Sequence, residues 1–290
     1  MATDKQQSQD DDFERAAGQL EAPLTSLVGD YEEADDSESP VMPSKGVYLL
    51  PNLFTTGALF CGFYAVIAGM QGDFYSGAVA VFVAMVFDGL DGRVARLTNT
   101  TSAFGAEYDS LADMVSFGVA PALLMFNWAL AGAGKLGWVA AFLYTACAAL
   151  RLARFNTQRG VADSSYFTGL ASPAAAAVAA GSVWLGQSYE LAAGSAPLSW
   201  AHAGLLMGLG FLMIARFPYY SFKSIKLDAK VPFARILLLI GLVGLVALDP
   251  PLVLWCLFFV YALSGPAQHL RRNVVKLKDQ ETTSNEQSLH

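Results

Sequence analysis

The sequence predicts an all-α fold, a polytopic bundle of transmembrane helices. Of its 290 residues, 54% are hydrophobic and only 15% are charged, and the mean hydropathy is +0.40. The apolar residues fall into blocks of about 18 to 25, the length that a helix needs to cross a bilayer core. A membrane β-barrel would show shorter segments with alternating polarity. Lipid is therefore the expected surrounding, and a soluble domain is excluded.

Hydropathy from Val47 onward predicts eight spans. The first six belong to a membrane core at residues 45–230, and the last two form a helical hairpin at 231–270 that turns at Asp249. The expected spans are 47–69, 74–95, 106–131, 137–156, 168–187, 199–216, 232–248 and 251–268.

Both ends of the chain are expected to be polar and cytoplasmic. Residues 1–44 carry twelve acidic residues against Lys5 and Arg15, with little periodic apolar content, which indicates a disordered acidic tail. They lack the basic and apolar regions of a secretory signal peptide. Residues 271–290 form a second polar tail. With both ends inside, all basic residues except Lys135 fall on the cytoplasmic side, as the positive-inside rule requires.

Five acidic residues are concentrated at the end of the second span and the start of the third: Asp88, Asp91, Glu107, Asp109 and Asp113. Asp88 and Asp91 are three residues apart, and Asp109 and Asp113 four apart. Each pair therefore lies on one face of its helix. An antiparallel helix pair with a short connection would bring the two faces together.

Four carboxylates that converge near a membrane surface repel one another unless cations lie among them. Hard divalent ions with oxygen ligands suit such a cluster. Gly89, Gly92 and Gly105 lie among the acids and would leave room for a ligand. The alternative is a set of helix-end aspartates paired with Arg93 and Arg96.

The segment 88–113, DGLDGRVARLTNTTSAFGAEYDSLAD, fits the pattern D-x-x-D-G-x-x-A-R, eight residues, then G-x-x-x-D-x-x-x-D. In this it resembles the CDP-alcohol phosphotransferase family. The fixed positions are Asp88, Asp91, Gly92, Ala95, Arg96, Gly105, Asp109 and Asp113. The resemblance covers about residues 47–220.

Further segments are similar to bacterial family members that use serine as the acceptor. The chain departs from their pattern at Ala171, where they carry proline. The segments are PNLFT at 51–55, DSLADMVSFGVAPA at 109–122, RLARFN at 151–156, FTGLASPAAAA at 167–177 and FKSIK at 222–226.

The resemblance implies transfer of a phosphatidyl group from CDP-diacylglycerol to L-serine, giving phosphatidylserine and CMP. It implies two divalent cations, Mg²⁺ or Mn²⁺, held by Asp88, Asp91, Asp109 and Asp113, with Asp113 also acting as the general base. It assigns the nucleotide and its phosphates to Gly92, Ala95, Arg96 and Gly105. Asn52, at the start of the first span, is a further candidate phosphate ligand.

A serine carboxylate needs a cationic partner, and a guanidinium can bind it through two hydrogen bonds. Arg151 and Arg154 lie three residues apart at the cytoplasmic end of the fourth span, on one helix face. Arg216, Lys223 and Lys226 follow the sixth span and are the next candidates. Each of these residues also fits a simpler role in membrane topology and contact with anionic lipid.

Two other functions stay open at this point. One is the same chemistry with glycerol phosphate, inositol phosphate or choline as the acceptor. The other is a divalent-cation transporter, although a permeation path would distribute its acids across the membrane depth. The expected partners are the lipid bilayer and, by the resemblance, a second copy of the chain, with no nucleic acid. The expected location is the bacterial cytoplasmic membrane, with the site facing the cytoplasm.

Overall fold

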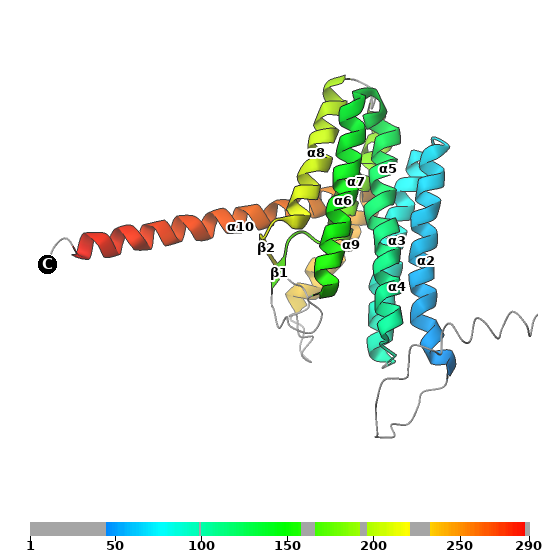
Figure 1. Cartoon of the computed structure of the whole chain (residues 1–290), viewed down its shortest axis with the longest axis horizontal. Helices are drawn as coiled ribbons and strands as arrows, with labels where there is room; N and C mark the ends of the chain where they lie inside the picture. The colour runs from blue at the N-terminus through cyan, green and yellow to red at the C-terminus, as the bar shows by residue number, and fades with distance from the viewer. Residues whose placement is uncertain (1–44, 99, 158–165, 192–195, 221–232, 288–290) are drawn as a thin grey trace, which may run out of the picture. The chain divides into compact units, whose positions relative to one another are not determined.

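The computed structural model describes residues 45–98, 100–157, 166–191, 196–220 and 233–287, so the predicted tail at 1–44 lies outside the described residues. The described chain is helical apart from one short ribbon of two strands (Figure 1). The elements are α2 (Lys45–Met70), α3 (Phe74–Leu97), α4 (Ala103–Asp113), η1 (Met114–Val119), α5 (Ala120–Met125), η2 (Phe126–Leu130), η3 (Ala131–Ala133), α6 (Lys135–Thr157), β1 (Tyr166–Thr168), α7 (Ser172–Ser188), α8 (Ala196–Ile214), β2 (Pro218–Tyr220), α9 (Phe233–Leu248) and α10 (Pro250–Gln287).

Each predicted span coincides with helical structure, and the segments from α4 to η3 run on as one continuous length of helix. Within the described residues, five segments are long and apolar enough to cross a membrane, which makes the chain a multi-pass membrane protein. That all eight predicted spans cross the bilayer stays a prediction. The five segments are Leu50–Met70, Ala103–Ala133, Lys135–Thr157, Pro197–Ile214 and Pro250–Arg271.

The fifth predicted span begins later than expected. Residues Tyr166–Thr168 form strand β1, which pairs antiparallel with β2 so that Phe167 lies opposite Tyr219. The helix cannot extend back through this segment because Gly169 has a φ of +87° and Pro173 occupies the first turn of α7. The prediction of helices alone therefore missed a small ribbon, whose strand β1 lies between α6 and α7 and whose strand β2 follows α8.

The region predicted as a helical hairpin and a polar tail contains helices α9 and α10. Asp249 alone separates α9 from α10, and its Oδ1 accepts a hydrogen bond from the Leu252 amide at 3.2 Å. The Tyr189 hydroxyl also donates to Asp249, which ties the end of α7 to this turn and raises the pKa of Tyr189. Helix α10 then continues to Gln287, because residues 271–287 contain neither glycine nor proline.

Two side chains cap the helices that carry the acidic residues. The Asp73 carboxylate accepts from the Ser76 amide at 3.1 Å at the start of α3. The Ser102 hydroxyl accepts from the Gly105 amide at 3.0 Å at the start of α4. Such caps satisfy amide groups that the helix itself leaves unpaired. They fix where each of the two helices begins.

A π-helical segment, η1, begins directly after Asp113. The buried Tyr144 hydroxyl of α6 donates to the Phe117 carbonyl at 3.0 Å, and the Thr145 hydroxyl donates to the Gly118 carbonyl at 3.3 Å. Wide helical turns of this kind occur mostly as short segments near functional sites. Helix α6 thus holds the irregular backbone that follows the last acid.

Small side chains let the helices approach closely. The alanines of α7 from Ala174 to Ala180 are buried, and α7 packs against both α3 and α10. Trp255 of α10 donates its indole N–H to the Ser182 hydroxyl of α7 at 2.8 Å. Close contact of small residues and interhelical hydrogen bonds are the usual basis of helix association in lipid.

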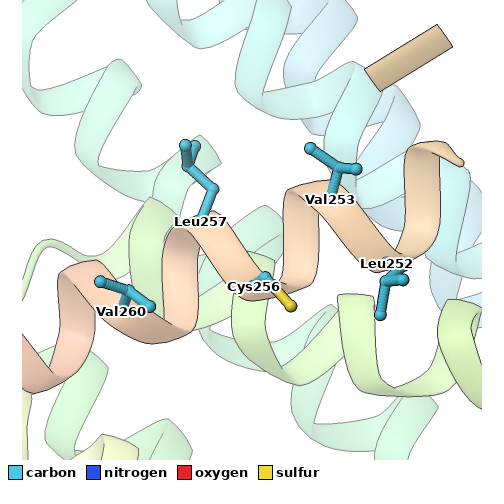
Figure 2. A pocket seen from close by; sticks show the side chains of 5 residues that line it. All are labelled: Leu252, Val253, Cys256, Leu257 and Val260. Atoms are coloured by element: carbon cyan, nitrogen blue, oxygen red, sulfur yellow. The ribbon is translucent and has the colours of Figure 1, made fainter. Parts of the chain in front are cut away.

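An apolar pocket lies along α10 (Figure 2). Its lining carries no charged side chain, so it offers no charged partner to a phosphate. A surface of this kind suits contact with lipid chains. The lining residues are Leu252, Val253, Cys256, Leu257 and Val260.

Arg154 fastens the ribbon to the helices around it. Its guanidinium donates to the carbonyls of Thr168 at 2.7 Å, Ile214 at 3.0 Å and Met213 at 3.4 Å. Gly169 lies beside these hydrogen bonds, and a Cβ added to it would come to 2.5 Å from the Met213 carbonyl oxygen. The backbone at Gly169 therefore leaves no room for a side chain.

We expect Gly169→Ala to lower the free energy of unfolding by about 2 kcal/mol or more, because alanine would adopt a strained φ and collide with backbone oxygen. Thermal unfolding of the purified protein in detergent measures the effect. Gly204→Ala is the matched control, since Gly204 lies in α8 with open space around its Cβ position. An unchanged melting temperature for Gly169→Ala would contradict this account of the ribbon.

Candidate active site

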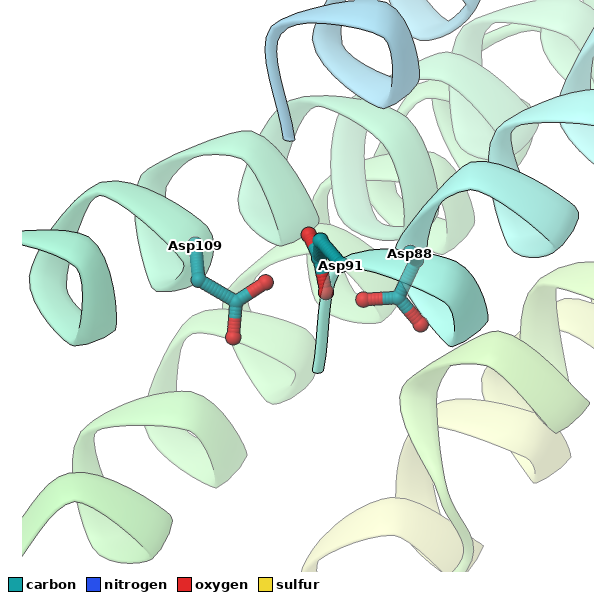
Figure 3. A group of neighbouring side chains, drawn as sticks. All are labelled: Asp88, Asp91 and Asp109. Atoms are coloured by element: carbon teal, nitrogen blue, oxygen red, sulfur yellow. The ribbon is translucent and has the colours of Figure 1, made fainter. Parts of the chain in front are cut away.

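Three carboxylates from two helices face one another (Figure 3). Asp88 and Asp91 come from α3, and Asp109 comes from α4. One oxygen from each lies within 4.8 Å of the other two. Asp91 is buried, with 6% of its surface exposed, and the other two are half-buried. The predicted convergence of the two helix faces is present in the structure.

The chemistry of this cluster fits a divalent cation. Unit negative charges at this separation repel by about 3 kcal/mol per pair at an effective dielectric constant of about 20. The ligand atoms are carboxylate oxygens, which Mg²⁺, Mn²⁺ and Ca²⁺ prefer. Open space surrounds the Cβ positions of Gly89 and Gly92, directly beside the acids. The three carboxylates could therefore hold a metal ion and still leave room for a ligand.

Asp113 lies next to this cluster, at the end of α4. Its carboxyl group lies close enough to Asp88, Asp109 and Arg151 of α6 to interact with them electrostatically. The structure thus brings all four predicted aspartates together and adds one cation beside the last of them. Of the four aspartates, Asp113 is the one that interacts with Arg151.

Helix α2 contributes the residues nearest to the cluster from outside the motif. The Thr55 hydroxyl donates to Asp91 Oδ2 at 2.9 Å, across the closely packed α2–α3 pair. Asn52 places its Oδ1 only 3.3 Å from where a Cβ on Gly105 would lie. Asn52 was predicted as a phosphate ligand, whereas Thr55 was not predicted. The signal for Thr55 was its place in the segment PNLFT.

The predicted nucleotide residues of α3 lie on the turns that carry or follow the acids. Gly92 is exposed, and Ala95 is half-buried one turn further along the helix. Arg96 is exposed, and its Nε donates to the Gly92 carbonyl at 2.7 Å. The Arg96 side chain therefore turns back along its own helix toward the acids.

Arg151 and Arg154, which the sequence treats as equivalent, have different surroundings. Arg151 Nη1 donates to the fully buried Ser172 hydroxyl at 2.8 Å, and its buried Nε has no hydrogen-bond partner within the described part of the chain. Arg154 donates to three backbone carbonyls. Arg216 is exposed just after α8. The last predicted candidates, Lys223 and Lys226, lie outside the described residues.

A polar network between α4 and α6 was also missed by the sequence reasoning. The Ser110 hydroxyl donates to Asn156 Oδ1 at 3.0 Å, and Asn156 Nδ2 donates to Glu107 Oε2 at 3.3 Å. Glu107, the fifth acidic residue of the region, is thereby engaged with α6. The signal for Asn156 was its place in the segment RLARFN.

Comparison with known proteins bears directly on this site. The model of the CDP-alcohol phosphatidyltransferase family matches residues 48–263. The chain is 37% identical over 222 residues to a CDP-diacylglycerol–serine O-phosphatidyltransferase of Helicobacter pylori, covering 77% of this chain and 92% of the relative.

More distant relatives with the same name occur in other lineages. The chain is 33% identical over 208 residues to the protein from Methanocaldococcus jannaschii, covering 71% of this chain and 90% of the relative. It is 30% identical over 224 residues to the protein from Mycobacterium tuberculosis, covering 75% of this chain and 77% of the relative. The match includes the carboxylate cluster and most of the helices around it, and the chain belongs to the CDP-alcohol phosphatidyltransferase family.

Proposed function

We propose that this protein transfers a phosphatidyl group from CDP-diacylglycerol to L-serine and releases CMP. The observation that carries the proposal is the group of facing carboxylates Asp88, Asp91 and Asp109, with Asp113 close to Asp88. The relatives that cover most of the chain are named as enzymes of this reaction. The product of the transfer is phosphatidylserine.

Asp88, Asp91, Asp109 and Asp113 would hold two divalent cations, Mg²⁺ or Mn²⁺. When bound, such ions neutralise the charge of the pyrophosphate and fix the geometry of the displacement. The all-oxygen ligand set and the short distances between the carboxylates support this assignment.

In the reaction the serine hydroxyl oxygen forms a bond to the phosphorus that carries the diacylglycerol group. The bond from this phosphorus to the oxygen bridging it to the CMP phosphate breaks, and CMP leaves with the electron pair. Asp113 would take up the proton of the serine hydroxyl, because a positioned carboxylate can act as a general base. Its proximity to Asp88 and to Arg151 supports this role.

The nucleotide would lie along the exposed end of α3, against Gly92, Ala95 and Arg96. Open space at Gly92 allows a phosphate group to approach the backbone there. Arg96 provides positive charge to this surface. Gly105 and Asn52 lie close together across from it and would provide a polar contact to the same phosphates.

The serine carboxylate would bind to Arg151 rather than to Arg154. Arg151 lies near Asp113, and its buried Nε–H lacks a partner among the described residues, so it has a donor to offer a ligand. A buried donor without an acceptor costs about 1–3 kcal/mol, and a bound carboxylate would remove that cost. The donors of Arg154 already serve backbone carbonyls.

The lipid substrate would enter from the bilayer, and serine would enter from the cytoplasm. We place the site at the cytoplasmic face of the bacterial inner membrane because the basic residues lie at that end of the predicted topology. A homodimer is part of the proposal, by analogy with the family.

The direct experiment measures CMP release by the purified protein with CDP-diacylglycerol, Mg²⁺ or Mn²⁺, and a panel of alcohols. Serine should support turnover, whereas glycerol phosphate, inositol phosphate and choline should not. CMP release with one of these alcohols and none with serine would overturn the assignment of the acceptor and leave the phosphatidyl transfer intact.

We expect Asp88→Asn, Asp91→Asn, Asp109→Asn and Asp113→Asn each to lower CMP release at least about a hundredfold. Loss of a metal ligand or of the base removes about 3 kcal/mol or more of transition-state stabilisation. Asp73→Asn is the control, because asparagine also caps helices and Asp73 lies at the opposite end of α3. Near-normal activity in two of the four variants would contradict the metal-cluster assignment.

Arg151→Lys should raise the KM for serine about ten- to a hundredfold and leave the KM for CDP-diacylglycerol nearly unchanged. Lysine keeps the charge but removes the planar pair of donors, and one such contact is worth about 1.5–3 kcal/mol. Initial rates over a range of serine concentrations give the value.

Arg154→Lys is the informative comparison for this measurement. It should lower the melting temperature, since it breaks bonds to backbone carbonyls, while the folded protein keeps its KM for serine. A normal KM for serine in Arg151→Lys, or an equal rise in both variants, would contradict the assignment of the carboxylate to Arg151.

A further inference from the structure

The buried hydroxyl of Thr55 is the contact through which helix α2 touches the carboxylate cluster. Thr55 is 3% exposed, and its Oγ1 lies 2.9 Å from Asp91 Oδ2. Asp91 is the most buried of the three clustered acids and so has the least access to water. A buried carboxylate depends on donors from the protein, because water cannot replace them.

We propose that Thr55 is a positioning residue that fixes the orientation of the Asp91 carboxylate for binding a divalent cation. This inference rests on the metal-binding part of the proposed function. Groups that hydrogen-bond a metal ligand from behind fix its orientation, and losing one typically costs about ten- to a hundredfold in metal affinity or activity.

The local structure of α2 limits how the hydroxyl can turn. Thr55 Oγ1 also lies 3.2 Å from the carbonyl of Pro51, one turn earlier in the same helix. One hydroxyl proton cannot satisfy both acceptors fully, and a carboxylate is the stronger acceptor. The shorter distance to Asp91 agrees with that preference.

The packing of α2 on α3 keeps the two side chains in register. A Cβ added to Gly57 would lie 3.2 Å from the Phe87 ring, so the helices already approach closely next to Thr55. Thr55 and Asp91 are 36 residues apart in the chain and meet only because of this packing. The orientation of one metal ligand is therefore set by a helix outside the aspartate motif.

Thr55→Val tests the hydroxyl with little change in shape. The full-length protein in detergent is titrated with Mn²⁺ in the absence of substrate, and electron paramagnetic resonance measures the unbound ion. We expect Thr55→Val to raise the Kd for Mn²⁺ about ten- to a hundredfold. Thr55→Ser, which keeps the hydroxyl, should stay within about threefold of the wild type.

Ser182→Ala is the control, because the buried Ser182 hydroxyl of α7 donates to the Val178 carbonyl one turn earlier and accepts from the Trp255 indole, away from the carboxylate cluster. It should leave the Kd for Mn²⁺ unchanged. Wild-type affinity in Thr55→Val would overturn the proposal. An equal loss in Thr55→Ser and Thr55→Val would also overturn it, since packing rather than the hydroxyl would then be responsible.

A double-mutant comparison separates a positioning role from general loss of structure. If Thr55 acts through Asp91, adding Thr55→Val to Asp91→Asn should change the Kd for Mn²⁺ by less than about twofold. A further tenfold loss in the double variant would contradict the proposal. Because the titration uses no substrate, its result is independent of which alcohol the enzyme accepts and of whether CMP is released.

Discussion

The mutual repulsion of Asp88, Asp91 and Asp109 is the constraint on which the arrangement of this site depends. Helices α3 and α4 present these carboxylates to one another at half-buried or buried positions in an apolar bundle. Such an arrangement is stable only when positive charge or donor groups compensate it. The surrounding residues provide hydrogen-bond donors and positive charge that hold these carboxylates together where little water reaches them.

Each neighbouring helix contributes to that compensation in a different way. Helix α2 provides a hydroxyl to Asp91, and α6 brings the cation of Arg151 close to Asp113. The π-helical turn after Asp113 is held by hydroxyl groups of α6 as well. The same helix thus holds the backbone that follows the proposed base and also carries the cation that interacts with it. Arg154, one turn further, joins the site to the ribbon that follows.

The positions of the helices, and the placing of the acids on one face of each helix, can be predicted from the sequence because both depend on local patterns. Long apolar blocks determine the helical segments, and spacings of three and four residues place the acids on one face of each helix. The contact between Thr55 and Asp91 could not be predicted in this way. It joins two different helices, and the spacing of residues within α2 does not indicate which residue of α3 lies opposite Thr55.

The two arginines and the ribbon show the same limit. Arg151 and Arg154 share a helix face, yet the partner of Arg151 lies 21 positions away and those of Arg154 lie 14, 59 and 60 positions away, and these partners decide their roles. The strands β1 and β2 are only three residues long, and β1 directly precedes an apolar block, so the hydropathy pattern does not separate the strand from the helix that follows. The φ of Gly169, which separates β1 from α7, depends on the carbonyls packed around it.

The most direct test of the central claim is the anomalous scattering of Mn²⁺ in crystals of the protein grown with CDP-diacylglycerol. The account predicts strong peaks between α3 and α4, within bonding distance of the carboxylate oxygens of Asp88, Asp91 and Asp109 and in contact with the pyrophosphate of the lipid. Bound CDP-diacylglycerol with Mn²⁺ at another place in the bundle, or with no ion at these carboxylates, would contradict it.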